Sequence, residues 1–291
     1  MSPLQSSPPP FSSYTKQLLN DTGRLLGISA KECAAFSNRG QLQLGPLTFS
    51  VACKKNQQRE PSWLIASQSR PPSLDQQQWL QALLRATMTA QVCGQWAFAT
   101  DGNDLGALYC ALGPELCYPE LVSASFLGAM QFWSDLIDGA KKQERAQTIP
   151  TDFNPNDSLD PHAELEAPRA VRVLIAEALL ELGFDADKAQ QGAQRGQFFL
   201  DQHPVFLTMA VDRPTLLLVS PLLVSHTQST LLSKLLCLNS VVFPALGIAA
   251  AASPAGLQLL NRWPLDPRQP VALARWFRSF TDYARELSQS N

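Results

Sequence analysis

Charged residues are scarce in this sequence, and neither sign of charge dominates. Asp, Glu, Lys and Arg make up only 16% of the 291 residues, and the formal net charge is −2. Proteins that bind nucleic acid through its phosphates need clustered basic side chains. No basic block occurs along this chain. We therefore expect no nucleic-acid partner.

The motifs of common catalytic and metal-binding sites are also missing. The chain contains no G-x-S-x-G, P-loop, G-x-G-x-x-G or H-E-x-x-H motif, and no metal-spaced cluster of Cys and His. Its three histidines, His162, His203 and His226, are far apart in the sequence, and we expect them to be solvated. We predict that the protein is not an enzyme and that it uses neither a cofactor nor a metal.

The cysteine pattern argues against a disulfide framework. The six cysteines form no C-x-x-C motif, and five of them precede residue 118, so they do not divide evenly between the two halves of the chain. We predict buried, reduced thiols, as in a cytosolic protein. The cysteines are Cys33, Cys53, Cys93, Cys110, Cys117 and Cys237.

Neither a secretory signal nor a membrane span is predicted. The N-terminal segment MSPLQSSPPPFSS has no positively charged region and no apolar region of the kind that signal peptides contain. The most apolar window, residues 231–252, is interrupted by Lys234, Asn239 and Pro244. It predicts a buried helix followed by a strand instead of a membrane-spanning helix. We expect a soluble, cytoplasmic protein.

The sequence does contain a globular proportion of hydrophobic residues, 45%, and these residues follow a tandem repeat. The segment SWLIAS at 62–67 recurs as TLLLVS at 215–220, and residues 79–87 recur in the same way at 231–239. Six such segments occur in the same order in both halves, and their displacement drifts only from 158 to 147 residues. Small loop deletions would produce this drift, so we infer a duplication.

Each copy predicts the same order of elements. An amphipathic helix comes first, because apolar residues recur at i, i+3, i+4 and i+7. Two strands, a leucine-rich helix, a hairpin and an aromatic helix follow. The predicted fold is α+β, with two tandem copies of an α-β-β-(β)-α-β-β-α unit and a twisted antiparallel sheet in each. The predicted boundaries are a disordered tail at 1–13, unit 1 at 14–138, a linker at 139–168 and unit 2 at 169–291.

The leucine-rich helix of each copy is a candidate for contact between the copies. Capping boxes at Ser73–Gln76 and Ser225–Gln228 predict where the two helices begin. Each apolar stripe has two interpretations: it is core of its own unit, or part of it forms an interface between the units. The candidate interface residues are Trp79, Leu83, Leu84, Leu232, Leu235 and Leu236.

The element order and two long segments resemble a known family. Copy two contains LGIAAAASPAGLQLLNRWPLDPRQPVALARWFRSFTDYAREL, in which a strand, a short turn, a second strand and an aromatic helix follow one another. This order resembles the C-terminal half of class I type III secretion chaperones, the Tir-chaperone-like family. The segment SWLIASQSRPPSLDQQQWLQALLRATMTAQ in copy one resembles the preceding strand, loop and dimer helix. The resemblance covers residues 14–138 and 169–288.

The resemblance implies a bacterial cytoplasmic chaperone without enzymatic activity or a cofactor. Members of the family are homodimers that hold the N-terminal segment of a secreted effector in extended form and deliver it to the secretion machinery. The implied partner is such an effector, with the export ATPase or sorting platform as a further candidate. The implied effector-binding residues lie on the first helix and first strand of each copy and are Leu18, Leu25, Phe49, Val51, Leu174, Ile175, Phe206 and Leu207.

Two features depart from the family pattern. The chain carries two units instead of one, and its second unit is slightly basic, with 11 Lys and Arg against nine Asp and Glu from residue 169 onward. A second unit allows one polypeptide to supply both halves of a dimer, because linkage replaces a bimolecular association. We therefore expect a monomer arranged as an intramolecular pseudo-dimer.

Two other functions are compatible with the sequence. One is an adaptor or regulator of the same fold that binds a partner protein without a secretion substrate. Co-purification with the N-terminal segment of a secreted protein would distinguish the chaperone from this adaptor. The other is a small-molecule-binding protein or enzyme with a cleft between the two units, which a ligand retained through purification would favour.

Overall fold

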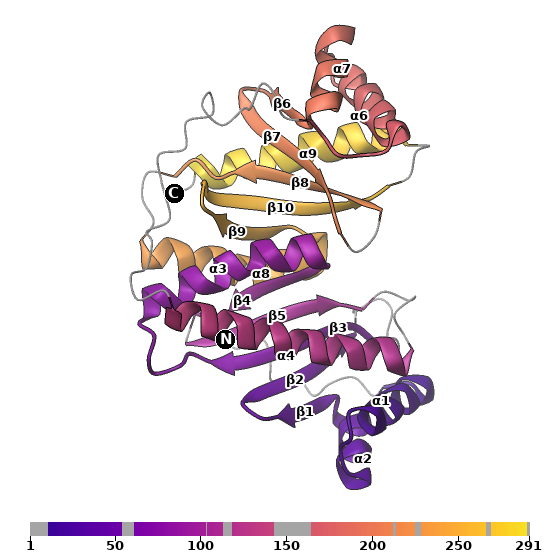
Figure 1. The fold of residues 1–291 in the computed structure, drawn as a ribbon, viewed down its shortest axis with the longest axis vertical. Coiled ribbons are helices and arrows are strands. Elements are labelled where there is room, and N and C mark those ends of the chain that lie inside the picture. Colours follow the sequence, from indigo (N-terminus) through magenta and orange to yellow (C-terminus); the bar gives the residue numbers. More distant parts are fainter. Residues whose placement is uncertain are drawn as a thin grey trace.

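The computed structural model shows two α+β units in tandem, each with a five-stranded antiparallel sheet, which confirms the predicted fold class (Figure 1). The structure describes residues 11–53, 61–102, 104–112, 118–142, 164–211, 214–224, 228–265 and 269–289. Unit 1 contains α1 (Ser13–Leu25), α2 (Ala30–Arg39), β1 (Gln41–Leu44), β2 (Leu47–Cys53), β3 (Pro61–Ser69), α3 (Gln76–Cys93), β4 (Trp96–Thr100), β5 (Leu105–Ala111) and α4 (Pro119–Lys142). Unit 2 contains α6 (Arg169–Glu181), α7 (Ala186–Arg195), β6 (Gln197–Leu200), β7 (His203–Met209), β8 (Thr215–Pro221), α8 (Ser229–Leu246), β9 (Ala249–Ser253), β10 (Gly256–Pro264) and α9 (Pro270–Gln289).

The two sheets have the same topology. The strand order is β1-β2-β3-β5-β4 in unit 1 and β6-β7-β8-β10-β9 in unit 2, and every neighbouring pair is antiparallel. In both units the β-hairpin formed by the last two strands is inserted so that its second strand pairs with the third strand of the unit. This shared, non-sequential order is what a duplication of one unit produces.

Each unit has one helix and one strand more than the minimal predicted order. The additional helices, α2 and α7, each precede a short strand, β1 or β6. These two strands come before the two predicted strands of their unit, whereas the optional strand was placed after them. Local sequence signals fix both helices. Ser29 and Glu32 form a capping box at the start of α2, and Gly40 ends that helix in the left-handed conformation. At the start of α7, the Asp185 side chain caps the helix by accepting from the backbone N–H of Lys188, without a capping box. Gly196 ends the helix in the left-handed conformation.

The predicted capping boxes of the leucine-rich helices are wrong. Helix α3 begins two residues later than predicted, because Asp75 accepts from the backbone N–H of Gln78 and the Gln78 side chain accepts from the backbone N–H of Asp75. Helix α8 has Gln228 at its N-cap, without a side-chain bond. Ser225 lies outside the described residues.

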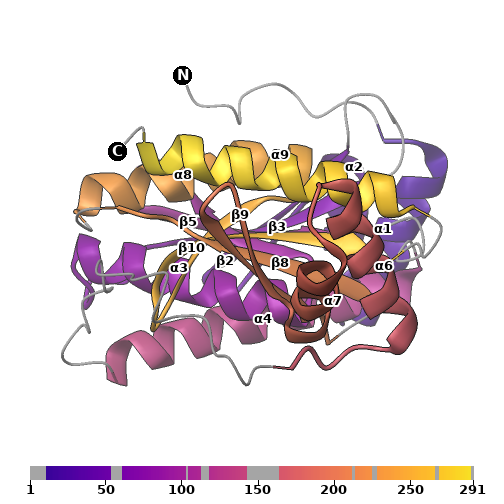
Figure 2. The same ribbon diagram turned by 90° about the horizontal axis from the view of Figure 1, so that it is seen from above.

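The molecule has three layers, with both sheets in the middle one (Figure 2). Helices α3 and α4 cover one side of this layer, and α8 and α9 cover the other. The edge strands β4 and β9 face the middle of the molecule, where α3 packs against both β4 and β9, and α8 packs against both strands as well. Each of these two helices therefore belongs to one unit and also covers the sheet of the other.

Aromatic side chains fill the core between each sheet and its own helices. In unit 1, the ring of Phe126 on α4 lies 4.6 Å from that of Phe49 on β2, and Trp133 lies edge-on to Phe98 at 5.0 Å. In unit 2, Phe277 on α9 contacts Phe198 on β6 at 5.3 Å. The final aromatic helix of each copy thus packs as the sequence predicts.

Parts of the predicted tail and linker belong to the folded units. Phe11 is buried against Gly40, and Ser12 caps α1, although both were assigned to a disordered tail. Leu165 is buried in the same way against Gly196 and donates its backbone N–H to Gln194, although it was assigned to the linker. Helix α4 also extends to Lys142, four residues beyond the predicted end of unit 1. Residues 1–10 and 143–163 lie outside the described part of the chain.

Within the described residues, α8 is the single helix long and apolar enough to cross a membrane by length and composition. It packs against β4, β9 and α3, and its residues Leu232, Leu236 and Phe243 are fully buried. Core helices of large domains have this composition as well, and the sequence predicted a buried helix followed by a strand in this window.

Candidate interaction surfaces

Among the described residues, no group of three or more His, Cys, Asp or Glu side chains could hold a metal ion. His203 is buried at the start of β7, whereas the sequence predicted a solvated side chain, and burial lowers its pKa below the usual value. His162 and His226 lie outside the described residues. Cys33, Cys93, Cys110 and Cys237 are free thiols; Cys33 and Cys110 are buried, but Cys93 is exposed, contrary to the prediction for all six.

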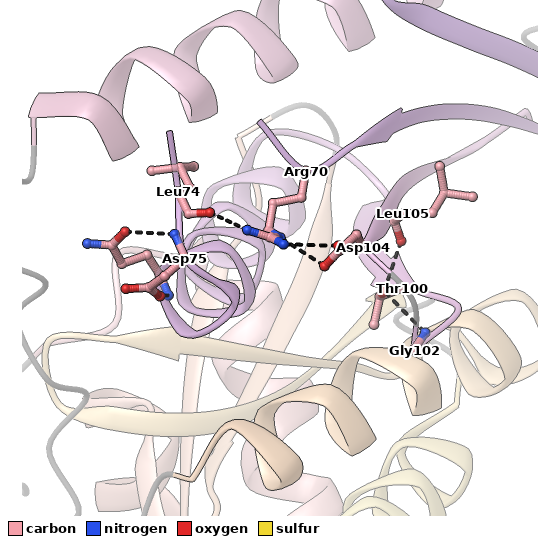
Figure 3. Close-up of polar contacts among 8 residues, drawn as sticks. Arg70, Leu74, Asp75, Thr100, Gly102, Asp104 and Leu105 are labelled. Carbon is pink, nitrogen blue, oxygen red and sulfur yellow. Dashed lines mark hydrogen bonds and ion pairs between the residues drawn. The ribbon is translucent and has the colours of Figure 1, made fainter. Parts of the chain in front are cut away.

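A polar network joins the β3–α3 loop to the β4–β5 turn (Figure 3). The Arg70 guanidinium donates to both carboxylate oxygens of Asp104, at 2.8 Å and 3.0 Å, and also to the backbone carbonyl of Leu74. The backbone N–H of Arg70 donates to the carbonyl of Asp104 at 2.7 Å. Arg70 holds the pKa of Asp104 below its usual value.

This network has a structural role. On one side of it, Asp75 caps α3, and on the other, Thr100 donates to the carbonyl of Leu105 and accepts from the N–H of Gly102, which shapes the turn (Figure 3). It therefore fixes the start of α3, the helix that reaches the second unit. The two charged side chains of the network, Arg70 and Asp104, pair with each other.

The structure places six of the eight predicted effector-binding residues in the interior. Phe49 and Ile175 are fully buried, and the other four are at most 7% exposed. All six side chains belong to the main hydrophobic core. The six residues are Leu18, Phe49, Val51, Leu174, Ile175 and Leu207.

Two of the predicted residues do reach the surface. Leu25, at the end of α1, is 55% exposed, and Phe206 on β7 is half-buried against Val219 and Leu260. Phe206 lies on the face of its sheet that is turned away from α9, because its strand neighbours Val205 and Leu207 pack in the core of unit 2.

The first helix of each unit has an exposed apolar face in addition to its buried one. On α1 this face carries Tyr14 and Leu25, which are eleven residues, or about three helical turns, apart. On α6 it carries Val173 and Leu180, about two turns apart. We call these four residues the first-helix faces. They lie at opposite ends of the long axis of the molecule (Figure 1).

The predicted interface helices do pack against each other, but several of the named residues serve their own unit. The indole rings of Trp79 and Trp133 stack with their centroids 5.8 Å apart, and both rings and Leu83 close over Gly106 in unit 1. The other named residues, Leu84, Leu232, Leu235 and Leu236, are buried in the main core. The two interpretations of the stripe are therefore both partly right.

The direct contacts between the units come mainly from the C-terminal halves of α3 and α8. Phe243 on α8 packs against Trp63 and Ala97 of unit 1. Met88 and Val92 on α3 pack against a cluster in the sheet of unit 2 formed by Leu217, Val219, Ala251 and Leu260. The helical periodicity continued through these positions, but the sequence alone gave no sign that their partners lie in the other copy.

No family model, curated protein or solved structure matches this chain. The fold defines a class: an α+β protein of two similar units, each with a five-stranded antiparallel sheet.

Proposed function

We propose that this protein is a bacterial cytoplasmic type III secretion chaperone. It binds the N-terminal segment of a secreted effector in extended form, keeps that segment soluble and delivers it to the export apparatus. The observation that carries the proposal is the pairing of two similar α+β units through α3 and α8 within one chain. This pairing is the arrangement expected if a duplicated chaperone unit replaces a homodimer.

The surfaces of the molecule suit an extended apolar segment. The first-helix faces expose Tyr14 and Leu25 at one end and Val173 and Leu180 at the other, so a segment contacting both must run along the molecule. Strands β1 and β6 are the outer edges of the two sheets, where an extended chain can add a strand by main-chain hydrogen bonds. Ordering such a segment costs a few kcal/mol, which a long contact surface offsets.

Affinity purification of the full chain from its native host, followed by mass spectrometry, tests the proposal. We expect one or a few secreted proteins, and limited proteolysis of the complex should leave only their N-terminal segments protected. A partner protected over a whole folded domain would show an adaptor instead. A retained small molecule without a protein partner would show a ligand-binding protein.

Charge substitutions on the first-helix faces locate the cargo contact. Leu25→Glu and Leu180→Glu should each weaken cargo binding about tenfold, because a bound apolar segment would have to desolvate the carboxylate. Both side chains are exposed in the free protein, so the thermal midpoint should change little. Leu127→Glu on α4, which is 60% exposed but lies outside these faces, is the matched control. Equal affinity of all three variants and the wild type would place the cargo elsewhere.

A further inference from the structure

We propose that unit 1 is built to pair with unit 2 and not with a second copy of itself. The two positions that decide this are Thr87 on α3 and Asn239 on α8, with Arg262 on β10 as a third contribution. Thr87 and Asn239 occupy equivalent places in the two copies, 152 residues apart. Recognition between the units does not depend on what the protein binds.

The polar groups at stake belong to two sheet edges buried at the centre of the molecule. Phe98 on β4 and Ala250 on β9 each point their backbone N–H and C=O out of the sheet, towards α3 and α8. Phe98 is fully buried and Ala250 is 1% exposed, so these four backbone groups need partners from the protein.

Thr87 and Asn239 together supply all four partners. The Thr87 hydroxyl accepts from the N–H of Phe98 at 3.1 Å and donates to the carbonyl of Leu83 in its own helix. The Asn239 carboxamide accepts from the N–H of Ala250 at 2.7 Å, and its Nδ2 donates both to the carbonyl of Ala250 at 2.9 Å and, across the units, to that of Phe98 at 2.8 Å.

The chemistry of these two side chains makes the pairing directional. A hydroxyl has a single donor, which Thr87 has already given to Leu83, whereas an amide has two donors and Asn239 uses both. In a pair of unit 1 copies, each Phe98 carbonyl would face a second Thr87 and would have no donor. Leaving a buried carbonyl without a partner is costly, and the pair would contain two of them.

The C-terminus of α3 depends on unit 2 as well. The carbonyls of its last turn have no partner within the helix. Two of them are satisfied across the units: Arg262 donates to Gln91 at 2.6 Å, and the N–H of Val211 donates to Val92 at 3.3 Å. Strand β5, the counterpart of β10 in unit 1, contains no cationic residue that could replace Arg262.

The C-terminus of α8 is capped within its own unit. Gly247 ends this helix in the left-handed conformation, and its N–H donates to the carbonyl of Phe243. The apolar contacts of the two helices are also unequal. On α8, the ring of Phe243 lies with its centroid 5.4 Å from that of Trp63, whereas α3 packs the smaller Val92 and Met88 against the sheet of unit 2. The surfaces of the two units are thus complementary to each other and are not interchangeable.

The test uses the full chain with a protease site inserted between residues 143 and 163, so that cleavage after purification leaves both units present. Cleaved protein is equilibrated with an isotopically labelled sample, and native mass spectrometry counts each kind of pair. We expect exchange of units with the hetero-pair retained, and unit 1 homo-pairs at roughly a hundredth of the hetero-pairs or less. Comparable amounts of unit 1 homo-pairs and hetero-pairs would overturn the proposal.

Two variants of the cleaved chain separate recognition from folding. Asn239→Leu keeps the side-chain volume but removes the donor to Phe98, and should weaken the hetero-pair about a hundredfold. Asn239 also bonds to Ala250 on β9 of its own unit, so its loss could affect folding. Arg262→Met therefore provides a second test, and we expect it to weaken the hetero-pair about tenfold. Val241→Ser, at a 68% exposed position of α8, is the control and should change nothing. Wild-type pairing in both Asn239→Leu and Arg262→Met would refute the proposal.

Discussion

At the scale of single residues, Gly106 shows how tightly unit 1 is packed. A Cβ atom at this position would lie 2.8 Å from the Trp79 ring and 2.9 Å from the Trp133 ring. Both indoles are fixed, because they stack on each other and Trp133 also donates to the carbonyl of Ala66. The glycine is therefore required by space and not by its backbone conformation.

Gly106→Ala should destabilise the protein by about 1–3 kcal/mol, since the extra methyl group overpacks the core. Gly139→Ala is the matched control, because Gly139 is exposed in α4 with no atom within 4 Å of its Cβ position. There the change should be neutral or stabilising by up to about 1 kcal/mol through helix propensity. Urea denaturation of both variants measures the difference, and equal stabilities would contradict the packing described.

His203 makes folding stability dependent on pH. Burial lowers its pKa in the folded protein, and the positive charge of Arg285 lowers it further, against a hydrogen bond to the Pro221 backbone that raises it. The unfolded chain, in which the pKa is near 6.5, therefore binds a proton at a higher pH than the folded protein does. The buried, uncharged imidazole of His203 therefore stabilises the folded protein at neutral pH, and this stabilisation is lost as the pH falls below about 6.5.

We expect His203→Gln to lose less unfolding free energy than the wild type between pH 7.5 and pH 5.5, because glutamine does not titrate. Urea denaturation at the two pH values gives the comparison. An unchanged pH dependence would show that His203 is solvated in solution.

At the scale of elements, the two equivalent hairpin turns are built differently. The β6–β7 turn consists of Asp201 and Gln202, both with positive φ angles, 48° and 65°. This left-handed conformation favours glycine, and the β1–β2 turn has Gly45 there, with a φ of 57°. Unit 2 thus keeps the turn at a cost in backbone strain that unit 1 avoids.

Gln202→Gly should stabilise the protein by about 0.5–1 kcal/mol. The relief of backbone strain outweighs the destabilisation that results because glycine increases the entropy of the unfolded chain. In unit 1, Gly45 takes the first turn position, equivalent to Asp201. Gly45→Ala has no steric neighbour within 4 Å and should destabilise by about 1 kcal/mol through the backbone alone. Thermal and urea denaturation measure both. Destabilisation by Gln202→Gly would mean that the glutamine side chain stabilises the turn.

At the scale of the whole molecule, the edges that pair the two units are already satisfied within one chain. Strands β4 and β9 are covered by α3 and α8, so neither edge is left to recruit a second chain. We therefore expect light scattering to give a mass near 31.9 kDa at micromolar concentration. A stable particle of twice that mass would show that the units pair between chains.

Local periodicity explains why much of the fold follows from the sequence. The strands at 47–53 and 215–220 and the aromatic helices were predictable, because alternation and helical spacing are properties of neighbouring residues. Helices α2 and α7 were missed because each is only ten residues long. The capping box at Ser29 and the terminal Gly40 were nevertheless present in the sequence as signals for α2.

The sequence by itself determined the duplication, the α+β class and which residues are apolar. Only the tertiary structure decided what those residues face. Leu18 and Leu25 belong to one apolar pattern, yet the first is buried and the second exposed, because α4 covers only one side of α1. Asn239 interrupts an apolar window in the sequence, and only the approach of β4 and β9 makes it the bridge between the units. Burial and pairing depend on what lies opposite a side chain, which local sequence does not specify.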